Sequence, residues 1–294
     1  MSNSQEFETV SALEAAEFAP TQFVRWFREV APYMREVRGK TFVVAFGGEL
    51  IEASKLNNLV IDLSLLSALG VQLVVVYGSH PQVNQQLTLK GIDKQLQRGV
   101  IEPTPADVLE CCKEMAGEIR LDIEAAFSQG LPNTPMSNSQ IHIISGNFVT
   151  AQPVGIVDGV DYKHTGKVRK FDLDSIRKAL SLNAIVLLSP IGFSPTGEAF
   201  NLAMEELATS VAGALKADKL LFVTQDNRVR DAEGVLITEL AREEAEKLVT
   251  AQTLDPQTQS YLKWANEAVR LGVKRAHLIP FEIDGSLLLE YFTH

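Results

Sequence analysis

Two glycine turns follow two apolar segments, and turns of this kind bring backbone N–H groups close to a bound anion. Residues 40–46 lead into Gly47 and Gly48, and residues 71–77 lead into Gly78. Glycine lets a backbone approach a ligand closely, and successive N–H groups form concavities that hold phosphate oxygens. We therefore expect both turns to face one cleft that is built for an anionic, nucleotide-type ligand.

The strand before the first turn lacks the cation that phosphoryl chemistry needs. A lysine projecting beside the glycines would neutralise charge on a transferred phosphoryl group, but Ala45 stands in this strand. The pattern predicts a nucleotide-type architecture from which catalysis has been removed.

Composition favours a large globular α/β protein that handles a small metabolite. The chain has 294 residues, 46% of them hydrophobic, which is enough for one large domain or two smaller lobes. A net charge of −10 and a pI near 5.1 argue against nucleic acid or an anionic membrane as partner.

Cysteine and histidine usage predicts neither disulfides nor a metal site. Cys111 and Cys112 are adjacent in an expected helix, a spacing that suits neither a structural disulfide nor zinc. His80 and His164 have no partners at metal-ligand spacing, so we interpret both as structural or surface groups. With no apolar run of about 20 residues and no signal-peptide pattern, a cytoplasmic protein without a membrane span is expected.

Apolar segments alternate with amphipathic ones, as in a mainly parallel sheet covered by helices on both faces. Strands are predicted near 40–46, 71–77, 184–189, 219–224 and 275–280. Helices are predicted near 55–69, 80–90, 105–128, 172–181, 199–216, 241–249 and 258–271. Segments 140–152 and 160–170 fit hairpins or an edge addition, and 226–237 fits a further hairpin. The predicted fold is a three-layer α/β/α sandwich.

An amphipathic helix is predicted over residues 20–37, before the first strand. Its apolar stripe consists of Phe23, Phe27, Val30, Met34 and Val37. Pro32 is expected to kink or restart it. The stripe could dock on the chain's own core or on a neighbouring subunit, and the sequence leaves both open.

Several motifs, in this order, resemble the amino acid kinase family, and more closely the N-terminal kinase-like domains of bacterial N-acetylglutamate synthases. The resemblance covers nearly the whole chain from about residue 20. The motifs are Arg-Gly-Lys-Thr-Phe-Val (38–43) before Gly47, Gly48 and Glu49, Leu-Val-Val-Val-Tyr-Gly (73–78), Ser-Gly-Asn-Phe (145–148), Ala-Gln-Pro (151–153), Asp-Gly-Val-Asp-Tyr (158–162), Thr-Gly-Glu-Ala-Phe-Asn (196–201), His-Leu-Ile (277–279) and Gly-Ser-Leu-Leu-Leu-Glu (285–290).

The resemblance implies an inactive kinase site. Active acetylglutamate kinases carry lysines at the positions of Ala45 and Tyr261, and their Arg-Val-Thr-Asp motif is reduced here to Arg98. Loss of such cations costs several orders of magnitude in rate, so no useful kinase activity is expected. The alternative is an acetylglutamate kinase in which Lys40, Lys55 or Lys263 replaces the missing lysines.

The resemblance also implies regulation by L-arginine. In arginine-sensitive relatives the N-terminal helix and C-terminal lobe bind arginine, and the helices interlace subunits into a hexamer. The matching positions are Tyr33, His277 and Glu290, and a carboxylate suits a guanidinium group. Without the resemblance, His277 is an ordinary structural histidine, Glu290 a solvated helix residue, and Tyr33 a packing residue.

The domain organisation expected from the resemblance is a tail (1–19), an oligomerisation helix (20–37) and a kinase-like domain (38–294). The synthases carry a later acetyltransferase domain, which moves an acetyl group from acetyl-CoA to glutamate and which we expect to be absent here, acting in cis or trans. No cofactor is expected in this chain. Glutamate or N-acetylglutamate could still occupy the old cleft near Gly47, Gly48, Gly78 and Asn201. A third alternative is a scaffold for an acetyltransferase that ignores arginine.

Overall fold

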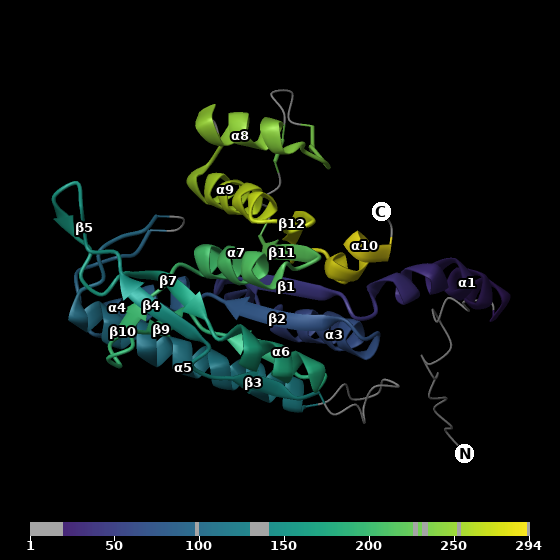
Figure 1. Cartoon of the computed structure of the whole chain (residues 1–294), viewed down its shortest axis with the longest axis horizontal. Coiled ribbons are helices and arrows are strands. Elements are labelled where there is room, and N and C mark those ends of the chain that lie inside the picture. Colours follow the sequence, from purple (N-terminus) through teal and green to yellow (C-terminus); the bar gives the residue numbers. More distant parts are fainter. Residues whose placement is uncertain are drawn as a thin grey trace, which may run out of the picture. The chain divides into compact units, whose positions relative to one another are not determined.

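The computed structural model describes residues 20–97, 100–129, 141–225, 229–230, 235–251 and 254–292 (Figure 1). The chain forms two compact units, Met1–Arg38 and Gly39–His294.

The described part of the first unit is the helix α1, Pro20–Val37. The helix continues through Pro32 without interruption, so the predicted restart is not observed. Val30 and Val37 of the predicted apolar stripe are buried and Met34 is half-buried, whereas the side chains of Phe23 and Phe27 lie outside the description. The helix itself is confirmed.

The second unit is built on a six-stranded sheet in which every neighbouring pair is parallel. Its order is β12 (Arg275–Pro280), β11 (Lys219–Thr224), β1 (Thr41–Phe46), β2 (Gln72–Tyr77), β8 (Ile185–Leu188) and β3 (Ile143–Ser145). All five predicted strands are present. For segment 140–152 either a hairpin or an added edge strand was predicted, and β3 is such an edge strand.

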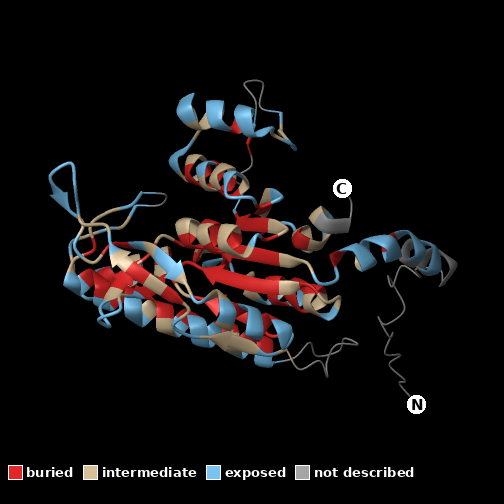
Figure 2. Ribbon diagram, viewed as in Figure 1, coloured by how far each residue is buried: buried red, intermediate tan, exposed pale blue. Residues whose placement is uncertain are grey.

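Helices cover both faces of this sheet. They are α2 (Glu49–Glu52), α3 (Leu56–Ala68), α4 (His80–Leu89), α5 (Ala106–Ser128), α6 (Leu173–Ser181), α7 (Met204–Leu215), α8 (Arg242–Ala251), α9 (Pro256–Arg270) and α10 (Ser286–Phe292). Figure 2 shows the central strands as the most deeply buried part of the molecule. Near-continuous apolar strands are expected when a parallel sheet has no solvated face.

The two faces of the sheet have different helical partners. Val43 and Val76 share a core cluster with α7 residues such as Leu207. The next residue along β2, Tyr77, points to the opposite face, where its hydroxyl donates to the carbonyl oxygen of Ala116 in α5 at 2.7 Å. This alternation fixes which side chains of β1 and β2 face α7.

A second, mixed sheet lies beside the central one, in the order β10 (Ala199–Asn201), β9 (Ile191–Phe193), β4 (Val149–Pro153) and β7 (Gly166–Phe171). Strands β5 (Ile156–Val157) and β6 (Val160–Asp161) form a separate ribbon. The antiparallel pairing of β4 with β7 agrees with the alternating patterns predicted there.

One boundary was predicted wrongly. The helix expected over 199–216 begins only at Met204, because residues 199–201 pair with β9 as strand β10. Phe200 is 2% exposed between two half-buried neighbours, a two-residue period that belongs to a strand. The hairpin predicted over 226–237 lies largely outside the described residues, although Arg230 and Leu236 form an antiparallel bridge.

Candidate functional site

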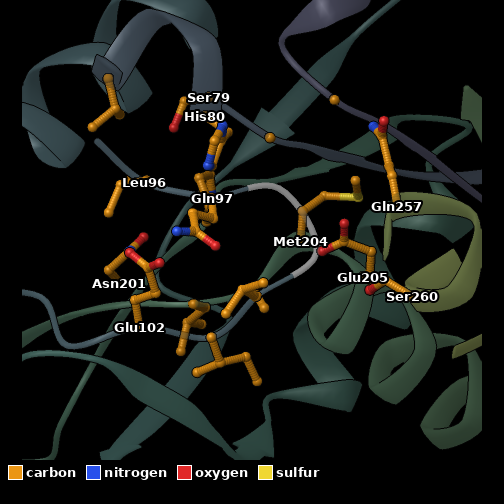
Figure 3. A pocket seen from close by; sticks show the side chains of 18 of the residues that line it. Ser79, His80, Leu96, Gln97, Glu102, Asn201, Met204, Glu205, Gln257 and Ser260 are labelled. Atoms are coloured by element: carbon orange, nitrogen blue, oxygen red, sulfur yellow. The ribbon is translucent and has the colours of Figure 1, made fainter. Parts of the chain in front are cut away.

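The carboxyl ends of β1 and β2 meet at a cleft, the place where open parallel sheets bind ligands. The Gly78 N–H donates to the Phe46 carbonyl oxygen at 2.8 Å, which joins the two strand ends. A Cβ at Gly78 would lie 3.4 Å from the Cα of Gly47, so the two turns are in close contact. The cleft has a cavity volume of about 130 Å³, and Gly47, Gly78 and Asn201 line it (Figure 3).

Gly48, the fourth residue predicted for this cleft, is not among its lining residues. Its carbonyl oxygen accepts a hydrogen bond from Nε2 of Gln82 in α4 at 2.9 Å. A Cβ at this position would stand 2.0 Å from Oε1 of Gln82 and 2.9 Å from Cδ of Pro81. The glycine is therefore required by the close approach of α4, whether or not a ligand binds.

The charged groups among the described lining residues of the cleft are acidic. They are Glu49, Glu102 and Glu205, and no lysine or arginine lies among the lining residues that the structure describes. In Figure 3 the Glu205 carboxylate points into the open space. Burial, and next the negative charge of Glu49, raise the pKa of Glu205 above its ordinary value. This arrangement disfavours a phosphate group.

The glycine turn itself is occupied by a carboxylate. A Cβ built on Gly47 would lie 2.0 Å from Oε2 of Glu49, so this oxygen covers the backbone of the turn. A phosphate oxygen approaching Gly47 would meet a group of its own charge.

The two positions predicted to have lost lysines are filled by core residues. Ala45 is 1% exposed and Tyr261 3% exposed, and both belong to the cluster beneath α7 and α9. The ring of Tyr261 packs on Phe222 with 5.3 Å between centroids. These positions now serve packing.

None of the three proposed replacement lysines is among the described lining residues of the cleft. Lys40 precedes β1 and so lies at the end of that strand opposite to the cleft. Lys55 occupies the position before the first residue of α3 without a side-chain capping bond, and Lys263 places its ammonium 5.2 Å from the ring centroid of Trp264. Arg98 is outside the described residues.

The structure brings together two of the three residues predicted for L-arginine. His277 in β12 places Nδ1 2.7 Å from Oε1 of Glu290 in α10. Nε2 of His277 is buried and has no hydrogen-bond partner in the described part of the chain. Tyr33 belongs to α1, in the other unit, and is 38% exposed.

The geometry assigns no catalytic role to the other histidines and the two cysteines that the sequence analysis considered. His80 begins α4 and lines the cleft, and Nδ1 of His164 lies 3.7 Å from Oε1 of Glu198. Cys111 and Cys112 are buried free thiols whose pKa values are raised by burial, so they stay protonated. In the described ranges no group of three or more His, Cys, Asp or Glu side chains could hold a metal ion. No described helix is long and apolar enough to span a membrane.

Sequence reasoning did not identify Glu205 or the two serines of the cleft, Ser79 and Ser260. Glu205 is in the first turn of α7, where an acidic residue is commonly explained by the helix dipole. Its position four residues after Asn201, the last residue of a family motif, was the available signal.

Comparisons with known proteins agree on one family. A sequence profile described as "Amino acid kinase family" matches residues 40–280. An "Amino-acid acetyltransferase" of Ralstonia nicotianae is 53% identical over 290 residues, which cover 97% of this chain and 64% of the relative. This chain therefore spans a little under two thirds of that relative's length.

Two solved structures have a similar fold over most of the chain. They are crystal structures of N-acetylglutamate synthase from Neisseria gonorrhoeae, one complexed with coenzyme A and L-arginine, the other with coenzyme A and N-acetyl-glutamate. Each has a TM-score of 0.82, 35% sequence identity and coverage of 92% of this chain. The match covers 63% of the first of those chains and 61% of the second.

Proposed function

Because the chain belongs to the amino acid kinase family, and because a relative 53% identical over nearly its whole length is an amino-acid acetyltransferase, we propose that it is the kinase-like domain of an N-acetylglutamate synthase. Such an enzyme transfers an acetyl group from acetyl-CoA to L-glutamate, the first step of arginine biosynthesis. In this proposal the domain regulates and assembles the enzyme, and a transferase domain outside the matched portion uses acetyl-CoA.

The observation that carries the proposal is that Ala45 and Tyr261, the two positions at which the family resemblance implies kinase lysines, are core residues. Ala45 and Tyr261 are buried against other apolar groups, and the adjoining cleft has carboxylates where a kinase needs cations. Electrostatic stabilisation of transferred phosphate accounts for most of the catalysis in such reactions. A domain retained without that chemistry is explained by regulation.

L-Arginine is the proposed regulatory ligand, held by the pair His277 and Glu290. An N-acetylglutamate synthase with 35% identity has been crystallised with L-arginine. An ionised carboxylate only accepts hydrogen bonds, so the contact with Glu290 places the proton of neutral His277 on Nδ1 and leaves Nε2 as an acceptor. Carboxylate and acceptor nitrogen together complement a guanidinium group. Tyr33 is proposed as a third member on the family resemblance alone.

Oligomerisation through α1 is the second part of the proposed regulation. Val24 and Tyr33 of this helix are 43% and 38% exposed, and the family resemblance implies subunit contacts for residues 20–37. We propose a hexamer in the cytoplasm, with residues 20–37 as the assembling helix and 38–294 as the kinase-like domain. The tail 1–19 lies outside the described residues. Arginine would then act by favouring one arrangement of the ring over another.

Calorimetric titration of L-arginine into the chain tests the regulatory proposal, with L-lysine as the control cation. We expect saturable binding of arginine and none of lysine. At an arginine concentration of about 100 times the dissociation constant, the free energy of unfolding should rise by about 2.7 kcal/mol. Oligomer size should be recorded with and without arginine. Equal responses to arginine and lysine would contradict the proposal.

An assay of ADP release with ATP and N-acetylglutamate tests the loss of kinase activity separately. We expect ADP release no faster than in buffer without the protein. Turnover well above that background would instead support the alternative of a kinase with rearranged cations.

A further inference from the structure

Helix α10 packs against α3 as well as against strand β12 (Figure 1). Leu287, which is 3% exposed, is the buried side chain among its described residues. The contact of Nδ1 of His277 with Glu290 adds a polar link between β12 and α10. Elements held by few buried groups open more easily than the core, so the docking of α10 is sensitive to the electrostatics of its contact with α3.

A carboxyl group lies on the buried side of α3. Leu59, Leu63 and Leu66 are buried there at helical spacing, and Asp62 belongs to the same side with 7% exposure. Asp62 is in the middle of the helix, so capping of a helix end does not explain it. An ionised carboxylate is costly to bury without a cation beside it, and no described lysine or arginine forms an ion pair with Asp62.

A second carboxylate acts on this group from the turn that begins α10. Asp284 is exposed and immediately precedes Gly285, whose φ of +69° shapes the turn. The Ser286 N–H donates to the carbonyl oxygen of Ile283 at 3.2 Å. The Leu289 N–H donates to the carbonyl oxygen of Gly285 at 2.9 Å. These bonds join the turn to the helix, so a displacement of Asp284 also displaces α10.

Burial and the second carboxylate act on Asp62 in the same direction. Burial, and next the negative charge of Asp284, raise the pKa of Asp62 to about 7. Strand β2 has no charged residue, and of the described charged groups on α5 and beside α10, Glu282 and Glu290 included, only Asp284 acts on Asp62. Undocking of α10 would hydrate Asp62 and remove Asp284, which reverses both causes. The docked helix therefore retains a proton that the undocked form releases as the pH rises towards about 7.

We propose that the contact between α3 and α10 depends on pH: α10 docks against α3 while Asp62 is protonated, and the helix loosens when Asp62 ionises and repels Asp284. The contact between His277 and Glu290 loosens with it, because Glu290 is on the same helix. The device concerns the docking of α10 alone, so it does not require that this pair binds arginine.

Amide hydrogen exchange of α10, followed by mass spectrometry of the whole chain at about pH 5 and about pH 8, tests the proposal. Exchange rates are divided by the intrinsic rates at each pH, so that protection alone is compared. In the unmodified protein, α10 should lose at least about tenfold in protection at the higher pH. This factor corresponds to a decrease of about one in the pKa of Asp62 when α10 undocks. Asp62→Asn should keep the same protection at both pH values, and Asp284→Asn should lose less than the unmodified protein.

Glu282→Gln is the matched control. It removes a carboxylate two residues before Asp284, in the same exposed segment, whose charge does not act on Asp62. Its loss of protection should equal that of the unmodified protein. Histidine side chains also titrate near neutral pH, so His277 is a competing source of pH dependence. If His277 were the source, the loss of protection would persist in Asp62→Asn.

The proposal is overturned if α10 keeps its protection between the two pH values, or if folded Asp62→Asn loses protection as the unmodified chain does. Melting temperatures show whether Asp62→Asn is folded. Asp284→Asn changes an exposed residue and gives a second test, because an unchanged loss in this variant would show that the two carboxylates do not act on each other.

Discussion

Nδ1 of His277 lies 2.7 Å from Oε1 of Glu290, so a side-chain contact joins the last strand of the central sheet to α10. The other ring nitrogen of His277 is buried and has no partner among the described residues. An unsatisfied buried polar atom costs about 1–3 kcal/mol, which a bound hydrogen-bonding group would recover. The contact and the unpaired nitrogen motivate the proposal that this pair binds a ligand.

Glu290→Gln should weaken L-arginine binding by about tenfold or more, because the neutral amide cannot form a charge-assisted bond to guanidinium. Isothermal calorimetry measures the change. The matched control is Glu198→Gln, which removes the carboxylate of the other histidine–glutamate pair, with His164 at 3.7 Å. Arginine affinity should be unaffected there. Equal affinity in both variants would exclude Glu290 from the site.

Ala45→Lys should not restore kinase activity and should destabilise the protein by about 3 kcal/mol or more. Ala45 is 1% exposed within the core, so a lysine there would be desolvated and would overpack its neighbours. Chemical denaturation measures the loss. Ala53→Lys makes the same substitution at an exposed position at the end of α2 and should change stability by less than about 0.5 kcal/mol. A stable, active Ala45→Lys variant would refute this account of the lost lysine.

Gly48→Ala should destabilise the protein by about 1–3 kcal/mol, because the new methyl group would meet Gln82 and Pro81 in α4. Gly117→Ala is the control, since a Cβ there has nothing within 4 Å and the position is inside α5. That variant should gain about 0.5–1 kcal/mol from higher helix propensity. Thermal or urea denaturation compares the two. If both variants gain stability, α4 does not constrain the turn.

Asp62 should make the protein less stable as the pH rises from about 4 to about 7. Burial, and next the negative charge of Asp284, raise the pKa of Asp62 from 3.8 to about 7. At a pH between 3.8 and about 7 the folded state binds more protons than the unfolded state, so the free energy of unfolding falls as the pH rises through this range. Above a pH of about 7 the contribution of Asp62 no longer changes. Solvent screening limits the effect to about 1–2 kcal/mol.

Asp62→Asn should remove the decrease in stability with rising pH. The free energy of unfolding of this variant, relative to that of the unmodified protein, should therefore increase from pH 4 to pH 7. Urea denaturation across this range measures the difference. Asp122→Asn replaces an exposed carboxylate of α5 and should run parallel to the unmodified protein. A constant difference for Asp62→Asn would show that Asp62 ionises normally.

Local patterns were sufficient to predict most of the framework. Continuous apolar runs located β1, β2, β8, β11 and β12, because parallel strands that are covered on both faces are apolar throughout. The period of 3.6 located most of the helices, because a helix buries one side. These patterns were wrong at 199–201, since a short strand with one buried residue has too few repeats to be distinguished from the first turn of a helix.

The sequence by itself determined the parallel α/β architecture, the paired glycine turns and the presence of Ala45 and Tyr261 where the family resemblance implies lysines. Motif order also singled out His277 and Glu290. Only the tertiary structure decided that these two side chains touch, that Glu49 covers the turn at Gly47, and that Glu205, Ser79 and Ser260 share one cleft. These relationships join residues far apart in the chain, and packing between elements sets them, so no local periodicity encodes them.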